Sequence, residues 1–523
     1  MSQNGLAMHH RYLQACLVVG LWMAFQADAA EVPKRSGIPQ GDGAALARVY
    51  CVQCHALPVA AHLDRRTWEA ELLPKMRYLA GLEPPPTNGY FKDLDLLLEA
   101  GVFPKEPRIP EHAFEAIAAH YLRTAPAQLP AGPADGPSPA QLTQFTPVPA
   151  PARRVPQLTP LALVDPHRRV LIVGDVTSQG VDFLEPDGAQ IGSLPLNNIP
   201  TAAVIRPDAL WFGCIGHFFP REEPRGQVIR MLQRPGSFHR QVLAEGLPRI
   251  ADLDVADLNG DGREDFVVCG FGNLIGRLSW FAAGTNDVFK ELVLLAEPGA
   301  VQCEIRDLDG NGTPDLAVLQ AQARERLLFF LNDGRGNFRS REVFQRDPGW
   351  GHSGFCFADM DGDGMDDLVV TNGDNADFHT SPPRPHHGIR ILRNRGGHRY
   401  DDWLFLLLPG AYKAVVRDFD GDGDPDIAAV SFFPDYEDTP QEGFVYFNNE
   451  GTAREPRFVR QTHPAALLGR WITLDAGDVD GDGDEDLVLG SLVGMPTAVP
   501  PEIRRLWEDR GPSVMILRNL RIP

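Results

Sequence analysis

Two cysteines and a histidine stand at a fixed spacing near the N-terminus, in the segment Cys51-Val52-Gln53-Cys54-His55. Two thiols three positions apart can form thioethers with the two vinyl groups of a haem, and the next imidazole can reach the iron. A redox pair would need a thioredoxin-like βαβ context, and structural zinc would need a second ligand pair. Neither pattern occurs nearby in the sequence. The segment therefore predicts covalent haem c, with Cys51 and Cys54 as anchors and His55 as proximal ligand.

The surrounding residues 31–125 are similar in size and order to a small class I cytochrome c. Apolar spacing predicts one helix over 44–50, which delivers the motif, and a second over 113–123, which crosses it. Met76 is the single methionine of this part, and a thioether on the iron would raise the haem potential. It follows His55 more closely than in most class I cytochromes, and a packing role is the alternative. Other candidates for the sixth ligand are His62, His112 and His120.

The first 30 residues have the composition of an export signal. A short basic opening is followed by an apolar core from Leu13 to Phe25 and by the small residues Ala27-Asp28-Ala29-Ala30. That core is too short for a stable membrane span, and no later run is long enough. Haem c attachment takes place outside the cytoplasmic membrane, which agrees with export. We therefore expect a periplasmic or extracellular protein without a membrane span.

Five segments repeat one nine-residue pattern, with oxygen-bearing side chains at positions 1, 3, 5 and 9 and glycines at positions 4 and 6. Alternate oxygens in a tight loop suit Ca²⁺, which takes six to eight oxygen ligands. An EF-hand would need a glutamate at position 12 and flanking helices, whereas position 12 is apolar or small here and the flanks are strand-like. The predicted ligands are Asp257, Asn259, Asp261 and Asp265; Asp307, Asp309, Asn311 and Asp315; Asp359, Asp361, Asp363 and Asp367; Asp418, Asp420, Asp422 and Asp426; and Asp478, Asp480, Asp482 and Asp486.

The loops begin 50 to 60 residues apart, and this region resembles the FG-GAP/VCBS repeat family, in which each repeat is one propeller blade. Segments such as 371–377, 410–413 and 469–471 resemble a subgroup of exported bacterial proteins with a haem-binding front. Two further strand-turn-strand units, at 161–173 and 201–212, lack the carboxylates. Together they predict seven blades, with six or eight as alternatives.

The expected fold is a small all-α cytochrome c-like domain followed by an all-β propeller. Its divisions are a signal peptide at 1–30, the haem domain at 31–125, a proline-rich linker at 126–160 and the propeller at 161–523. The linker holds ten prolines, so we expect an extended connection that separates two independent units.

The net charge of −21 argues against a nucleic-acid partner. The loops alone contain 21 Asp and 2 Glu against one Arg, and bound calcium would neutralise part of this charge. Four cysteines outside the motif and the signal can pair in an oxidising compartment or stay as buried thiols: Cys214, Cys269, Cys303 and Cys356.

Motifs of hydrolases, nicotinamide enzymes and phosphate-binding loops are absent from the sequence. One insertion, residues 374–387, gathers Asp377, His379, His386 and His387, and it is either part of a ligand site over the propeller funnel or a solvated loop. The leading hypothesis is electron transfer to a redox partner protein, with the propeller as the recognition scaffold. The alternatives are a haem-linked oxidoreductase with its substrate site in the funnel, and a glycan- or protein-binding module with an accessory haem.

Overall fold

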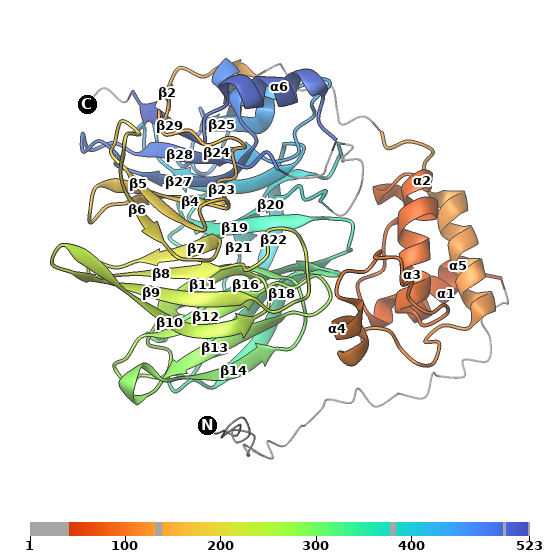
Figure 1. The fold of residues 1–523 in the computed structure, drawn as a ribbon. Coiled ribbons are helices and arrows are strands. Elements are labelled where there is room, and N and C mark those ends of the chain that lie inside the picture. Colours follow the sequence, from red (N-terminus) through yellow and green to blue (C-terminus); the bar gives the residue numbers. More distant parts are fainter. Residues whose placement is uncertain (1–40, 131–138, 377–382, 495–497, 521–523) are drawn as a thin grey trace, which may run out of the picture.

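The structure, a computed structural model, describes residues 41–130, 139–376, 383–494 and 498–520. The predicted signal peptide, residues 1–30, lies outside the described residues. Figure 1 shows a group of short helices beside a ring of sheets. We call the first part, residues 42–125, the helical region, and the second part the propeller. Within the described ranges, no helix combines the length and the apolar character that a membrane crossing needs.

The helical region is built on the crossing of its first and last helices. Asp42 caps the first one, accepting a hydrogen bond from the amide of Ala45 at 3.1 Å. A Cβ added to Gly43 would come within 2.1 Å of the carbonyl oxygen of Ala116, so this crossing requires glycine. The elements are α1 (Gly43–Tyr50), a turn Cys51–Gln53, a turn Ala60–His62, α2 (Arg65–Thr67), a π-helical turn Trp68–Leu72, α3 (Leu73–Leu79), α4 (Leu94–Glu99) and α5 (Glu111–Thr124).

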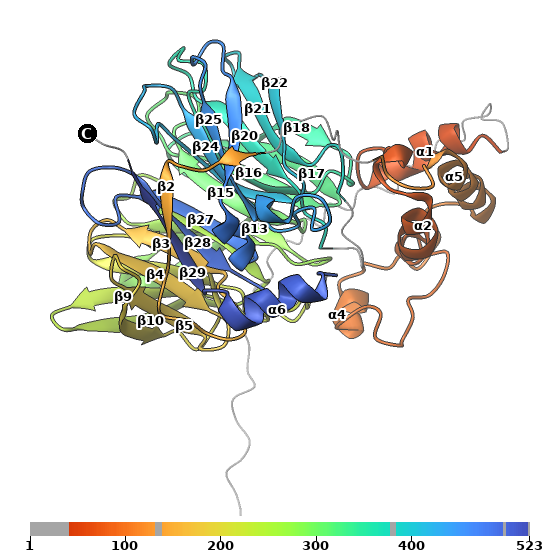
Figure 2. The same ribbon diagram turned by 90° about the horizontal axis from the view of Figure 1, so that it is seen from above.

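The rest of the described chain forms seven sheets, six with four strands and one with five. Each sheet is one blade, and successive blades pack on one another until β27 of the last blade contacts β3 of the first. Figure 2 gives a second view of these sheets, again with α1, α2 and α5 to one side of them. The seven-bladed propeller predicted from the repeats is therefore confirmed. Both units without the aspartate-loop pattern form blades, since the predicted strands at 161–173 and 201–212 belong to the first and second sheets.

The strands follow one another along the chain within each blade. The first three blades are β3 (Leu161–Asp165), β4 (Val170–Asp175), β5 (Gly180–Leu184) and β6 (Gln190–Pro195); β7 (Pro200–Ile205), β8 (Ala209–Cys214), β9 (Gly226–Arg234) and β10 (Ser237–Leu247); β11 (Ile250–Ala256), β12 (Asp265–Gly270), β13 (Arg277–Ala283) and β14 (Phe289–Leu295). The next two are β15 (Ala300–Arg306), β16 (Asp315–Gln322), β17 (Arg324–Asn332) and β18 (Phe338–Arg346); β19 (His352–Ala358), β20 (Asp367–Asn372), β21 (Gly388–Asn394) and β22 (Tyr400–Leu407).

The last two blades combine both ends of the propeller. The sixth holds β23 (Ala411–Arg417), β24 (Asp426–Ser431), β25 (Phe444–Asn449), β26 (Phe458–Thr462) and the added β1 (Ala140–Gln141), and the seventh holds β27 (Trp471–Gly477), β28 (Asp486–Ser491), β29 (Val514–Asn519) and β2 (Phe145–Pro149). A further helix, α6 (Pro501–Arg510), precedes β29. Because β2 pairs antiparallel with β29, the N-terminal end of the propeller closes the ring on its C-terminal end.

This closure corrects the predicted linker at 126–160. Residues 140–141 and 145–149 are paired strands of the propeller, which therefore begins about twenty residues before the predicted boundary at 161. The prolines of β2 are the reason why the sequence predicted a linker here. They fit because β2 is the outer strand of its blade, where a missing backbone N–H can face away from the ladder.

The second strand of each blade is buried along nearly its whole length, as in β8, β12, β20, β24 and β28. These strands read as continuous apolar runs because neighbouring blades cover both of their faces. Seven apolar clusters fill the seven contacts between adjacent blades. The core is therefore distributed around the ring.

The meander gives the propeller two different faces. Because neighbouring strands run antiparallel, the connections between first and second strands emerge on one face, together with all five aspartate loops. We call it the aspartate face. The connections between second and third strands, and those between blades, emerge on the opposite face. The helical region packs on this second face, which we call the cavity face.

Candidate functional site

The predicted haem-binding residues lie at the end of α1. Cys51 opens the turn that follows the helix, and Cys54 and His55 come directly after it. Both thiols are free, with Cys51 partly buried and Cys54 exposed. Nδ1 of His55 lies 2.8 Å from the carbonyl oxygen of Ala56, so this nitrogen donates its proton and leaves Nε2 as a lone pair. Desolvation lowers the pKa of His55, which favours the neutral, ligating imidazole.

A cavity of about 2340 Å³ joins these residues to the propeller. Its helical wall contains the three motif residues and an apolar lining, and its other wall belongs to the cavity face. The apolar lining includes Trp68, Leu72, Leu73, Phe114 and Ile117. Ligand pockets usually measure about 300–1000 Å³, so this cavity has room for a cofactor as well as a second molecule. The propeller wall includes Glu222, Asp347, Arg384 and Glu442.

The described structure does not favour the other interpretations of the two cysteines. Burial raises the pKa of Cys51 to about 11, whereas reactive thiols of redox pairs have a lowered pKa. Among the described residues, the groups placed to hold a metal ion consist of aspartates and include neither cysteine. The two free thiols, the imidazole of His55 with its Nε2 lone pair available, and the apolar wall of the cavity together fit a covalently attached haem.

Met76 stands in α3 and lines the same cavity as the motif residues. It is partly buried and packs against the apolar cluster of the helical region. Of the three alternative histidines, His62 also lines the cavity, but its Nδ1 lies 3.0 Å from a carboxylate oxygen of Asp347 on the propeller. His112 and His120 are not among the cavity-lining residues. Met76 therefore stays the predicted sixth ligand.

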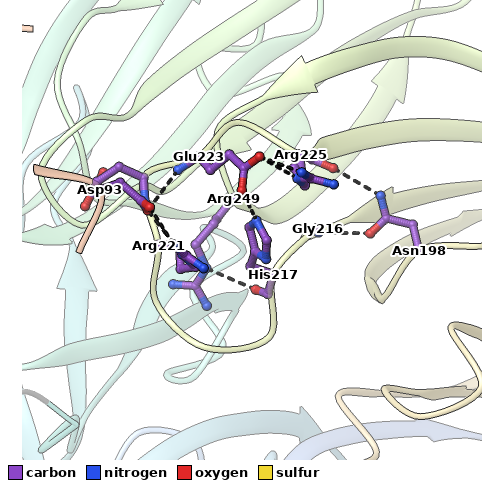
Figure 3. A network of polar contacts seen from close by, with 9 residues as sticks. Asp93, Asn198, Gly216, His217, Arg221, Glu223, Arg225 and Arg249 are labelled. Carbon is purple, nitrogen blue, oxygen red and sulfur yellow. Dashed lines mark hydrogen bonds and ion pairs between the residues drawn. The ribbon is translucent and has the colours of Figure 1, made fainter. Parts of the chain in front are cut away.

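The helical region is attached to the cavity face through Asp93, at the start of α4. One carboxylate oxygen of Asp93 accepts from Nη2 of Arg221 at 2.7 Å, and the other accepts from the amide of Glu222 at 2.8 Å. Asp93 has a left-handed backbone with φ of 53°, which aspartate tolerates better than most residues. Figure 3 shows the network continuing inside the propeller, where Glu223 pairs with His217 and Arg225.

Apolar side chains complete this contact. Phe91, Leu97 and Phe103 form a small buried cluster against Leu274 and Ile275 of the third blade. The amides of these two propeller residues donate to the carboxylate of Glu222. The sequence offered no signal for the contact, since Asp93 and Arg221 are 128 positions apart. The prediction of two separate units is thus replaced by a docked arrangement.

The aspartate loops have the backbone that the sequence predicts. The glycines at positions 4 and 6 have positive φ in every loop, from 69° to 96°. The aspartate at position 1 bends the loop by accepting backbone amides. Asp307, for example, accepts from Gly310 at 2.8 Å and from Gly312 at 2.9 Å.

The ninth-position aspartate fastens each loop to its blade. In Asp315, one oxygen accepts from the amide of Leu308 at 2.9 Å and the other from the amide of Asn332 at 2.7 Å. The same two bonds recur in the other loops, and these five side chains are almost fully buried. A carboxylate has further lone pairs, so these bonds leave room for a metal contact.

Four loops bring three aspartates together with ligand oxygens within 4.8 Å of one another. The groups are Asp307, Asp309 and Asp315; Asp359, Asp361 and Asp363; Asp418, Asp420 and Asp426; and Asp478, Asp480 and Asp482. Among the described residues the first loop forms no such three-carboxylate group; its position 3 is Asn259, and its Asp261 pairs with Arg263 at 2.7 Å. The last four loops therefore have carboxylate groups that could hold a metal ion, and calcium binding stays a prediction for all five.

The described end of the insertion at 374–387 is not solvated, which differs from one of the two alternatives given by the sequence. His386 and His387 are buried, at 8% and 0% exposure, and they pack under the helical region. Asp377 and His379 lie outside the described residues. A solvated loop was a plausible prediction for these histidines because the sequence does not show that the helical region covers the cavity face.

Calcium binding to the loops predicts a difference between equivalent substitutions. Asp307→Asn and Asp257→Asn alter position 1 in loops with the same backbone bonds, but only the loop of Asp307 has the three-aspartate group. A ligand that binds only the folded state at a hundredfold excess over Kd stabilises by about 2.7 kcal/mol. We expect Asp307→Asn to remove the part of the stabilisation that comes from its own loop, measured as a smaller calcium-dependent rise in melting temperature than in the wild type.

Asp257→Asn serves as the matched control and should keep nearly all of the calcium-dependent rise in melting temperature. If both variants lose it equally, the first loop also binds the ion. If neither loses it and metal analysis of the wild type finds no calcium, the loops are not calcium sites.

Acid should weaken the calcium effect. Burial raises the pKa of Asp367, Asp426 and Asp486 to about 6 in the metal-free propeller. A folded-state pKa above the ordinary value of about 3.9 means that the metal-free fold loses stability as pH rises from about 4 to 6. Calcium must displace these protons, so its stabilisation is largest above pH 6. The calcium-dependent rise in melting temperature should be clearly larger at pH 7 than at pH 5, and an equal rise at both would contradict this.

Comparison with known families supports the repeats. Residues 307–370 and 418–489 match the model of the FG-GAP-like repeat. The first match spans the second and third aspartate loops, and the second match spans the fourth and fifth. A search of curated proteins gives no significant match.

Solved propeller structures resemble this chain at low identity. BBS1N in complex with ARL6DN has 12% identity and a TM-score of 0.41, over 67% of this chain and 88% of that chain. The periplasmic gluconolactonase of Pseudomonas aeruginosa has 11% identity and a TM-score of 0.39, over 58% and 85%. The hydrazine synthase of Kuenenia stuttgartiensis has 11% identity and a TM-score of 0.42, over 66% and 95%. Likeness at this level says nothing of activity. The chain carries FG-GAP-like repeats within a seven-bladed β-propeller.

Proposed function

We propose that this chain is an exported monohaem c-type cytochrome fused to a calcium-stabilised propeller, and that it transfers electrons. The observation that carries the proposal is the position of Cys51, Cys54 and His55 on one apolar cavity that also holds Met76. Bound there, haem supplies reversible one-electron chemistry. Two cysteines anchor it, His55 presents Nε2 to the iron, and Met76 supplies a thioether.

The helical region contributes orientation and exclusion of water. The hydrogen bond from Nδ1 of His55 to Ala56 fixes the tautomer and the ring direction. Trp68 donates to the carbonyl of Ala60 at 3.0 Å, and Tyr121 donates to that of Pro58 at 2.9 Å. The bond of Tyr121 holds the segment after the motif against α5, and the bond of Trp68 holds it against the π-helical turn, so the apolar wall stays in place.

Export to the periplasm or beyond follows from the signal-like residues 1–30 and from the chemistry of haem c attachment. The propeller would then act as the recognition scaffold for a redox partner protein. Its acidic surface suits a partner with a basic patch, because opposite charges steer association.

The shared cavity also favours a second candidate, a haem-linked oxidoreductase. Its propeller wall carries polar groups such as Glu222, Arg384 and Glu442 opposite the haem motif. A small substrate bound there would lie beside the redox centre. Haem reduction on mixing with candidate small molecules, followed by absorbance, distinguishes this enzyme from a pure electron carrier.

Covalent attachment predicts that the mature protein gives a c-type spectrum in reduced alkaline pyridine. The double variant Cys51→Ala, Cys54→Ala should lose covalent haem, because no thiol is left to form a thioether. Cys214→Ala is the matched control, since that thiol is buried in the second blade, and it should keep full haem content. Haem that extracts from the wild type into acidic butanone would contradict the assignment.

Sulfur ligation predicts a weak charge-transfer band at long wavelength in the oxidised protein, absent from Met76→Ala. We also expect this variant to have a lower midpoint potential, because a thioether favours the reduced iron. Substitution of His120, which does not line the cavity, should change neither property. A band that persists in Met76→Ala would exclude Met76 as the ligand.

A further inference from the structure

Three histidines meet where the helical region touches the cavity face. His62 ends a turn of the helical region, and His386 and His387 stand just before β21 of the fifth blade. The ring centroids of His62 and His386 are 4.5 Å apart, and those of His386 and His387 are 5.1 Å apart. We call these three residues the histidine cluster.

Several imidazole nitrogens of the cluster lack a hydrogen-bond partner although they are buried. His387 has no exposed surface, and neither of its ring nitrogens has a partner within the described part of the chain. Nδ1 of His386 is likewise buried and unpartnered. Burying polar atoms without partners costs stability, so such atoms call for an unseen partner.

The remaining nitrogens are held as they are in metal-binding histidines. Nε2 of His386 lies 3.0 Å from the carbonyl oxygen of Gly349, which leaves Nδ1 as a lone pair. Nδ1 of His62 lies 3.0 Å from Oδ2 of Asp347, which leaves Nε2. A histidine ligand commonly donates its second N–H to a carbonyl or a carboxylate, which fixes the ring and its tautomer.

We propose that His62, His386 and His387 bind one divalent transition-metal ion, such as Zn²⁺, between the helical region and the propeller. Neutral imidazole is a good ligand for such ions, and three histidines leave one position of a tetrahedral site open. The site uses none of the proposed haem ligands and no residue of the calcium loops, although His62 lines the same cavity as the haem motif. Asp347 supplies compensating negative charge beside it.

Binding requires a small rearrangement. Among the described residues, the only groups with ligand atoms within 4.8 Å of one another are aspartates. At least one imidazole of the cluster must therefore turn about its side-chain torsions before three nitrogens reach one ion. His62 is the most exposed of the three, with 23% of its side chain accessible, and turning its ring would shift its contact with Asp347. His62 and Asp347 also line the large cavity, so the open position would be accessible from it.

Titration of the full-length protein with Zn²⁺ in calcium-saturated buffer tests the site, by calorimetry and with Co²⁺ absorption as a second readout. We expect one Zn²⁺ per chain beyond the calcium. His387→Gln and His62→Gln should each weaken binding at least a hundredfold, and Asp347→Asn should weaken it about 10–100-fold. His239→Gln, an exposed histidine of β10, is the control and should leave the affinity unchanged.

His62→Gln keeps the test valid if a buried substitution fails to fold, because its side chain is partly exposed, and its folding is checked by circular dichroism in chelator. Absence of stoichiometric Zn²⁺ binding to the wild type, or undiminished binding to a folded His62→Gln, would overturn the proposal. Haem content is measured separately, so loss of the haem assignment does not affect the zinc result.

Discussion

The propeller depends on one buried carboxylate that recurs in five of its blades. The ninth-position aspartate of each loop accepts one amide from its own loop and one from the end of the third strand, as Asp315 does with Leu308 and Asn332. This pair of bonds joins three strands of a blade at one point. The side chain of Asn332 also donates to the carbonyl oxygen of Leu258 in the preceding blade, so this aspartate-asparagine contact connects two neighbouring blades.

The same carboxylates create an electrostatic problem that a metal ion would solve. Each of the last four loops crowds three aspartates together, and burial raises the pKa of several ninth-position carboxyls. Without counter-charge, these groups repel one another or take up protons. With calcium, they would become ligands. The opposite face carries the longer connections, α6 and the helical region.

The sequence predicted features that repeat or that depend on neighbours in the chain. The five aspartate loops together with the two strand-turn-strand units at 161–173 and 201–212 predicted the number of blades, and the glycines predicted the loop backbone. The strand β2 escaped prediction because Pro147 and Pro149 resemble a linker, although an outer strand accepts them. The contacts of Asp93 with Arg221 and of His62 with Asp347 join residues far apart in the chain. No local pattern encodes such pairs, and the burial of His386 and His387 follows from the same docking.

The central claim is that the helical region, which carries the haem motif, is fixed on the cavity face and does not move as an independent unit. Small-angle X-ray scattering of two matched variants tests it most directly. Arg221→Glu places a carboxylate against Asp93, whereas Arg225→Glu removes an arginine that pairs with Glu223 inside the propeller (Figure 3). We expect the wild type and Arg225→Glu to scatter as one compact particle, and Arg221→Glu to have a larger radius of gyration. An already extended wild type, with the same curve for all three proteins, would contradict the docked arrangement.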